Sequence, residues 1–264
     1  MIYKYKLLLI FCMTILPFVS NADSARDITH KSFEYYKKGE ILFEKNQCKE
    51  AIEFFNKAID LTPGSILAYT AKGVAQNRLK QYNLALNTYD KALKIKRGKV
   101  NIEKWKNVSV HIYINKSITL MNLERHKEAL DTCDKGLVII QHPYLYNTKG
   151  AALAALNKYE EAIDSYNQAI ELDPNYFEPH QNKFCPLRNL KRYQEALETC
   201  DKAIALEPNR HNIYEVHTNR AMALNKLERH KEALEAAETA LKLMPDYGLA
   251  INAKKYAVQE LNKY

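Results

Sequence analysis

Glycine and proline are scarce in this 264-residue sequence, which contains seven of the first and eight of the second. An all-β fold needs many turns built from these residues, so their scarcity argues against that class. Beyond the first 20 residues there is no apolar run of the length, about 20 residues, that spans a bilayer. What remains is a chain long enough for one or two ordinary domains with a sizeable core.

The motifs of the common enzyme classes are also missing. No HExxH, GxSxG, Walker or GxGxxG run occurs, and no CxxC pair suggests a redox centre or a zinc site. Acidic residues are numerous, but they alternate with lysine and arginine at helical spacing. We therefore expect no enzymatic activity, no cofactor and no metal.

The formal net charge of +8 raises the question of a nucleic-acid partner. The basic residues do not gather in one block, however, and their alternation with acidic residues is typical of solvated helix faces. We expect no nucleic acid as a partner.

The N-terminus is predicted to be a secretory signal, residues 1–22. Lys4 and Lys6 precede an apolar run from Leu7 to Val19, and small residues follow it up to Ala22. We expect cleavage after Ala22 and a periplasmic or secreted mature protein. The alternative is an uncleaved anchor, which would be the chain's only link to a membrane. Residues 23–31 are polar and are expected to fray.

The rest of the chain repeats itself. Six alanines occupy the same local frame, separated by 34, 44, 33, 34 and 37 residues. In each copy this repeat alanine starts an apolar stripe that continues four and seven residues later, as in Ala51, Phe55 and Ala58, on one helix face. Proline ends that helix in most copies. The six repeat alanines are Ala51, Ala85, Ala129, Ala162, Ala196 and Ala233.

A second amphipathic segment precedes each stripe. In copy four it contains Tyr146, Gly150 and Leu153. Glycine costs a helix about 1 kcal/mol relative to alanine, so a close helix–helix contact at this position is the expected compensation.

An aromatic, a glycine, an alanine, an aromatic, a small residue and a proline in this order resemble the tetratricopeptide repeat (TPR) family. Copy one matches with Tyr35, Gly39, Ala51, Phe55, Ala58 and Pro63. The resemblance implies an all-α, right-handed α-solenoid of about six helix-turn-helix repeats over 32–247, closed by a capping helix at 248–264. The predicted repeats are 32–65, 66–99, 110–142, 143–176, 177–210 and 214–247, with an insertion at 100–109.

Two departures from the pattern stand out. The insertion contains the single tryptophan, Trp105, which either packs on the adjacent hairpin or forms a protruding contact surface; we expect it to lengthen the next helix, from Val100 to Met121. Copy five has Phe184 in place of the glycine and Pro186 two residues later, which predicts a kink near 182–186. That kink could bring Cys185 to Cys200 as a disulfide, or leave both as thiols.

The resemblance implies that the first helices line a concave groove that binds a protein or peptide. An extended peptide would pair with groove amides and place its side chains on apolar patches. A cluster of Lys, Arg and Asn that clamps a terminal carboxylate in some family members is not matched, because Tyr36 and Glu40 stand there. The predicted peptide-binding residues are Tyr36, Thr70, Val74, Asn77, Ile114, Ile118, Asn147, Gln181, Arg188, Thr218, Met222 and Asn225.

The leading functional hypothesis is thus a non-catalytic, exported TPR scaffold that binds a mainly neutral segment in its groove. The alternative is a structural assembly factor of an envelope or secretion complex that uses its convex or end surfaces. The sequence does not define the oligomeric state.

Overall fold

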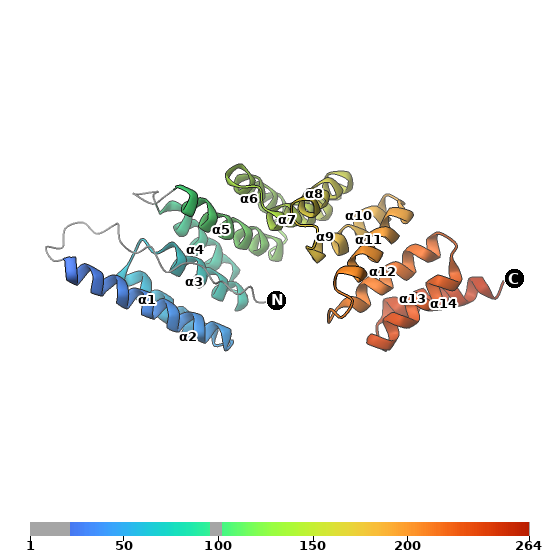
Figure 1. Cartoon of the computed structure of the whole chain (residues 1–264), viewed down its shortest axis with the longest axis horizontal. Helices are drawn as coiled ribbons and strands as arrows, with labels where there is room; N and C mark the ends of the chain where they lie inside the picture. Colours follow the sequence, from blue (N-terminus) through green and yellow to red (C-terminus); the bar gives the residue numbers. More distant parts are fainter. Residues whose placement is uncertain (1–21, 96–101, 264) are drawn as a thin grey trace. The chain divides into compact units, whose positions relative to one another are not determined.

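The computed structural model describes residues 22–95 and 102–263, and within them fourteen helices and no strand (Figure 1). The helices form two compact units that divide between Ile140 and Gln141. Unit 1 contains α1 (Ala22–Glu44), α2 (Cys48–Leu61), α3 (Ile66–Arg78), α4 (Tyr82–Lys94), α5 (Ile102–Asn122) and α6 (His126–Ile139). Unit 2 contains α7 (Pro143–Ala155), α8 (Tyr159–Leu172), α9 (Phe177–Asn182), α10 (Phe184–Asn189), α11 (Tyr193–Leu206), α12 (Ile213–Lys226), α13 (His230–Leu243) and α14 (Gly248–Leu261).

Consecutive helices pair as antiparallel hairpins, which confirms the all-α repeat fold. Two residues after the end of the first helix in each repeat, one residue has a left-handed backbone, at φ between 56° and 62°. The next N–H reaches back to a carbonyl five residues earlier, as from Gln47 to Leu42 at 2.9 Å, so the turn satisfies the helix end. The six left-handed residues are Asn46, Lys80, Glu124, Asn157, Lys191 and Glu228.

The packing glycines are explained by rings of the second helix in the same hairpin. A Cβ atom on Gly39 would lie 2.5 Å from Cε1 of Phe55, and one on Gly150 would lie 2.7 Å from Cε1 of Tyr166. Real Cβ atoms do not approach so closely, so only glycine lets the fully buried ring lie against the first helix. This confirms the close contact expected from the sequence.

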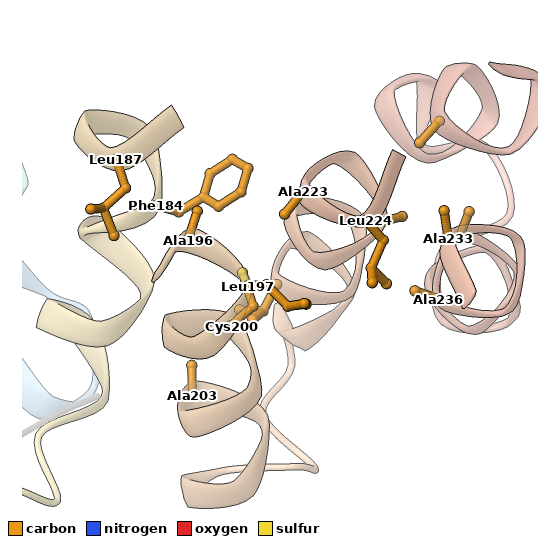
Figure 2. Close-up of a cluster of buried hydrophobic side chains, with 14 of the residues drawn as sticks. Phe184, Leu187, Ala196, Leu197, Cys200, Ala203, Ala223, Leu224, Ala233 and Ala236 are labelled. Atoms are coloured by element: carbon orange, nitrogen blue, oxygen red, sulfur yellow. The ribbon is translucent and has the colours of Figure 1, made fainter. Parts of the chain in front are cut away.

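Three repeats lack this glycine, and each also lacks the facing ring. The positions that correspond to the glycine and the ring hold Ser117 and Cys133 in repeat three, and Ala221 and Ala237 in repeat six. In repeat five they hold Phe184 and Cys200, so the large side chain now comes from the first helix. Both residues belong to one buried cluster, and Figure 2 shows the ring of Phe184 beside Ala196, one turn before Cys200 on α11.

The first helix of repeat five is broken, as the sequence predicts. It ends at Asn182 as α9 and resumes at Phe184 as α10, with Lys183 between them. Pro186 has no N–H to bond the carbonyl of Asn182, and its ring crowds that carbonyl, so the helix cannot run through.

Other expectations need correction or completion. Residues 23–31, expected to fray, continue α1, since each residue added to a packed helix gains a hydrogen bond. Trp105 is 8% exposed, which favours packing over a protruding contact surface. It lies in α5, the lengthened helix that the insertion predicts. The predicted signal lies outside the described residues except for Ala22. Helix α14 buries Ala250, Ala253 and Ala257.

Among residues 22–95 and 102–263, no helix combines the length and the apolar character needed to cross a membrane.

Candidate binding surfaces

Within each unit the first helices of successive hairpins approach one another. In unit 1, α1 contacts α3 and α3 contacts α5; in unit 2, α7 contacts α9, and α12 contacts α14. The second helices pack chiefly on the first helices before and after them. The first helices therefore line the inner side of each unit, and the predicted groove residues can be located on that side unit by unit.

The unit 1 groove residues include one exposed apolar side chain. Ile118 on α5 is 38% exposed, whereas Ile114 on the same helix is 8% exposed and belongs to the core. Val74 and Asn77 on α3 are half-buried, and the Oδ1 atom of Asn77 has no hydrogen-bond partner. Three of these four predicted positions can therefore contribute to a surface, and Ile114 cannot.

Polar groups at the N-terminal end of unit 1 bond to each other. The hydroxyl of Tyr36 donates to Glu40 at 2.6 Å, and Nζ of Lys37 donates to the second oxygen of that carboxylate at 2.6 Å. Thr70 donates to the carbonyl of Ile66 within its own helix. The carboxylate at this end leaves no place for a second one, which agrees with the missing terminal-carboxylate clamp.

In unit 2 the predicted groove amides form a network. Asn147 on α7 donates to the hydroxyl of Tyr176 at 3.2 Å and accepts from Asn182 on α9 at 3.1 Å. Gln181 on α9 donates to Glu215 on α12 at 2.9 Å. These amides are half-buried, and they link three consecutive first helices. These amides therefore hold the first helices together, and a ligand that bonds to them would compete with the bonds within the fold.

The four remaining predicted residues divide into two pairs. Arg188 is exposed and Met222 is half-buried, so both are available at the surface. Thr218 is 1% exposed and donates to the carbonyl of Tyr214, and Asn225 is 7% exposed. The amide of Asn225 donates to the main-chain carbonyl of Ala253 at 2.9 Å, so it ties α14 to repeat six. The prediction that Thr218 and Asn225 contact a ligand is therefore wrong, because their polar groups are buried and used within the fold.

Tyrosine pairs at the starts of the first helices were not predicted. Tyr144 lies 4.5 Å from Tyr176 between ring centroids, and Tyr214 lies 4.9 Å from Tyr247, edge to face. The first pair joins α7 to the start of α9, and the second joins α12 to the start of the capping helix α14. The signal was present in the sequence, since an aromatic residue stands near the start of each of these first helices, but only the fold shows which rings meet.

Burial shifts the pKa of several side chains in unit 2. Cys185 is exposed and Cys200 is buried, and both are free thiols, so the disulfide alternative does not hold. Burial raises the pKa of the Cys200 thiol, which keeps it protonated and unreactive. Burial likewise lowers the pKa of His180 and His217, which favours their neutral forms.

The fold and its repeat frame agree with comparisons to known proteins. Family models described as "Tetratricopeptide repeat" match residues 35–65, 66–99, 143–176, 187–210 and 214–247, more than half of the chain. The chain therefore belongs to the tetratricopeptide repeat family. The lengthened third repeat, and the broken first helix of the fifth as far as residue 186, lie outside these matched segments.

A DnaJ homolog subfamily C member 7 homolog of Schizosaccharomyces pombe is 29% identical over 178 residues, or 59% of this chain and 36% of that protein. The chain spans about a third of the length of the curated relatives it matches. Among solved structures, YrrB, a TPR protein with an unusual peptide-binding site, aligns with a TM-score of 0.58 at 24% identity, covering 76% of this chain and 97% of YrrB. PilW, a type IV pilus biogenesis factor, aligns with a TM-score of 0.71 at 15% identity, covering 84% and 97%. These structural likenesses show the fold alone.

Proposed function

We propose that this chain is a non-catalytic scaffold whose units bind extended segments of partner proteins on their inner sides. The observation that carries this proposal is the lining itself. Ile118 in unit 1 and Met222 in unit 2 are apolar and accessible on first helices, and the first helix α3 of unit 1 adds the uncharged, half-buried Val74 and Asn77. Apolar anchors beside amides are what an extended, mainly neutral peptide requires.

The test uses charged substitutions on opposite sides of the same unit. Peptides are selected from a random library against residues 23–264, and their affinities are measured by calorimetry. Ile118→Glu should weaken the affinity of peptides that bind unit 1 at least tenfold, because the new carboxylate would be desolvated against an apolar ligand. Leu84→Glu, on the second helix α4 where Leu84 is 54% exposed, is the matched control and should leave affinity unchanged.

Unit 2 carries the same comparison with Met222→Glu and the control Leu243→Glu, since Leu243 is a 53%-exposed residue at the end of α13. Equal weakening by the inner variants and by their controls would refute binding on the inner side.

A second candidate, an assembly factor that uses its end surface, is favoured by one feature of repeat one. Ile41 is 52% exposed, whereas its counterparts in later repeats, such as Ala75 and Ala152, are fully buried. Phe54 is only partly buried, where later repeats have small buried residues such as Thr88. The fold likeness to a pilus biogenesis factor is compatible with this role. In that case Ile41→Glu should abolish assembly of the envelope or secretion complex in cells, while the affinity of the chain for the selected peptides stays unchanged.

Export belongs to the same proposal and is supported by the sequence of residues 1–22. The mature protein should begin at Asp23, and N-terminal sequencing of protein from the native cell envelope checks this. A retained Met1 in the membrane fraction would support the uncleaved anchor, and recovery only from the cytoplasm would overturn export.

A further inference from the structure

A positively charged residue precedes the packing glycine, or the residue that replaces it, in every repeat and at the equivalent place in α14. These residues are Lys38, Lys72, Lys116, Lys149, Lys183, Arg220 and Lys254. From repeat two onward this position lies where a first helix meets the preceding second helix, so partial burial of the cation there favours a partner of opposite charge.

At two junctions between repeats and at the junction of repeat six with α14, the partner is a carboxylate five residues after the repeat alanine of the preceding hairpin. Nζ of Lys116 lies 2.6 Å from Asp90, and Nε of Arg220 lies 2.7 Å from Asp201. Nζ of Lys254 lies 2.9 Å from Glu238. The carboxylate neutralises the cation at each of these junctions.

The junction between repeats four and five departs from this rule. Asn167 stands at the carboxylate position, and Nζ of Lys183 donates to its Oδ1 at 2.8 Å. Burial is the main cause that lowers the pKa of the Lys183 ammonium, and nearby Lys202 lowers it further. Two carboxylates also face this ammonium from α11, but both have other partners. Glu195 accepts two bonds from the guanidinium of Arg192, and Glu198 accepts one from Gln194.

The junction at Lys72 also lacks the carboxylate, because Asn56 stands at that position in the second helix of repeat one. There burial is the main cause that lowers the pKa of the Lys72 ammonium, Lys91 lowers it further, and the Asp60 carboxylate partly offsets both. At Lys183 two cations, Lys202 and Arg192, face the ammonium, whereas Lys91 alone does so at Lys72.

We propose that Lys183 binds the carboxylate of an aspartate or glutamate side chain from a partner protein, at the junction of α8 with α9 to α11. The partner's carboxylate takes the place that Asp90, Asp201 and Glu238 occupy at the other junctions. The site is separate from the inner side, so it does not depend on peptide binding there.

The geometry allows an external carboxylate to reach the ammonium. Asn167 is exposed, and its bond with Lys183 lies at the surface. The corresponding pair in unit 1, Lys116 and Asp90, borders a hollow of about 450 Å³ between α4, α5 and α6.

The experiment measures binding of a fluorescently labelled hexaglutamate peptide to the purified full chain by anisotropy. Asn167→Asp supplies an internal carboxylate and should weaken the peptide's affinity about fivefold, the effect of one partly exposed ion pair, while raising the thermal midpoint. Gln168→Glu, one residue along α8, changes the net charge equally and should alter affinity less than twofold. Equal weakening by both variants, or none by Asn167→Asp, would overturn the proposal.

A second variant tests the proposal by a gain of peptide binding, so that the conclusion does not depend on a loss of affinity alone. Asp201→Asn removes the carboxylate that pairs with Arg220, and it should add a second hexaglutamate site. The matched control is Asp164→Asn, an exposed residue of α8 whose substitution changes the charge equally. An unchanged stoichiometry for Asp201→Asn, or the same gain for Asp164→Asn, counts against the proposed site.

Discussion

Exchanging the large and small residues of repeat five tests the packing rule of the whole fold. Phe184 is 1% exposed and Cys200 is 2% exposed in the same cluster (Figure 2), where repeats one, two and four have a glycine and a ring in the opposite order. The double substitution Phe184→Gly with Cys200→Phe would therefore restore the arrangement of those repeats within repeat five.

The magnitudes follow from the volumes involved. Phe184→Gly removes a fully buried ring, about 3–5 kcal/mol for truncation to alanine, and adds about 1 kcal/mol for glycine in a helix. Cys200→Phe alone places a second ring against the first and should cost about 1–3 kcal/mol or more. In the double variant the new ring fills the space that Phe184 leaves. The two substitutions should therefore couple favourably by about 3 kcal/mol, the upper range for residues in contact.

The assay is urea unfolding followed by circular dichroism, with the free energy of unfolding compared at constant m-value. Trp105 lies in unit 1, so its fluorescence follows the unit that is not mutated. Gly150→Ala is the control, because the added Cβ would meet Tyr166 with no compensating change. If the losses of the single variants add to within about 0.5 kcal/mol in the double variant, the two positions do not share one space and the reasoning is refuted.

Three further predictions follow from the same frame. Glu228→Gly should raise the free energy of unfolding by about 0.5–1 kcal/mol, because a left-handed backbone favours glycine, whereas Asn157→Ala should lower it; thermal melting checks both. Asn225→Ala should destabilise the chain by about 1–3 kcal/mol and speed hydrogen exchange in α14, since the Ala253 carbonyl loses its donor; lost peptide affinity with unchanged exchange would contradict this. Burial lowers the pKa of His217 below 6.5, so the folded state binds fewer protons there than the unfolded state, and its stability should fall as the pH drops below about 6.5. His217→Tyr, the residue of the first four repeats at this position, should reduce that pH dependence; an unchanged melting profile between pH 7 and 5 would show that His217 does not cause it.

The repeat frame was predictable because it depends on spacing along one helix. The stripe from Ala51 to Ala58, the close approach at Gly39 and the break at Pro186 each follow from residues within one hairpin. The burial of Asn225 and its hydrogen bond to α14 were not predictable in this way. Its partner, the Ala253 carbonyl, lies 28 residues away, and its burial depends on how α14 packs on repeat six. For the same reason Asn147 reads as a free groove amide in the sequence, although Tyr176 and Asn182 occupy its donor and acceptor.

Comparing the repeats with one another separates changes that preserve packing from changes that leave a group without its usual partner. Phe184 departs from its frame, but Cys200 departs in the opposite sense, so the pair conserves volume and needs no ligand to explain it. Lys183 keeps its frame while Asn167 loses the carboxylate, and no neighbouring carboxylate without another partner takes its place. A half-buried charge left in this way costs free energy in the isolated chain. The junction between repeats four and five is therefore where a partner that supplies a carboxylate would gain most.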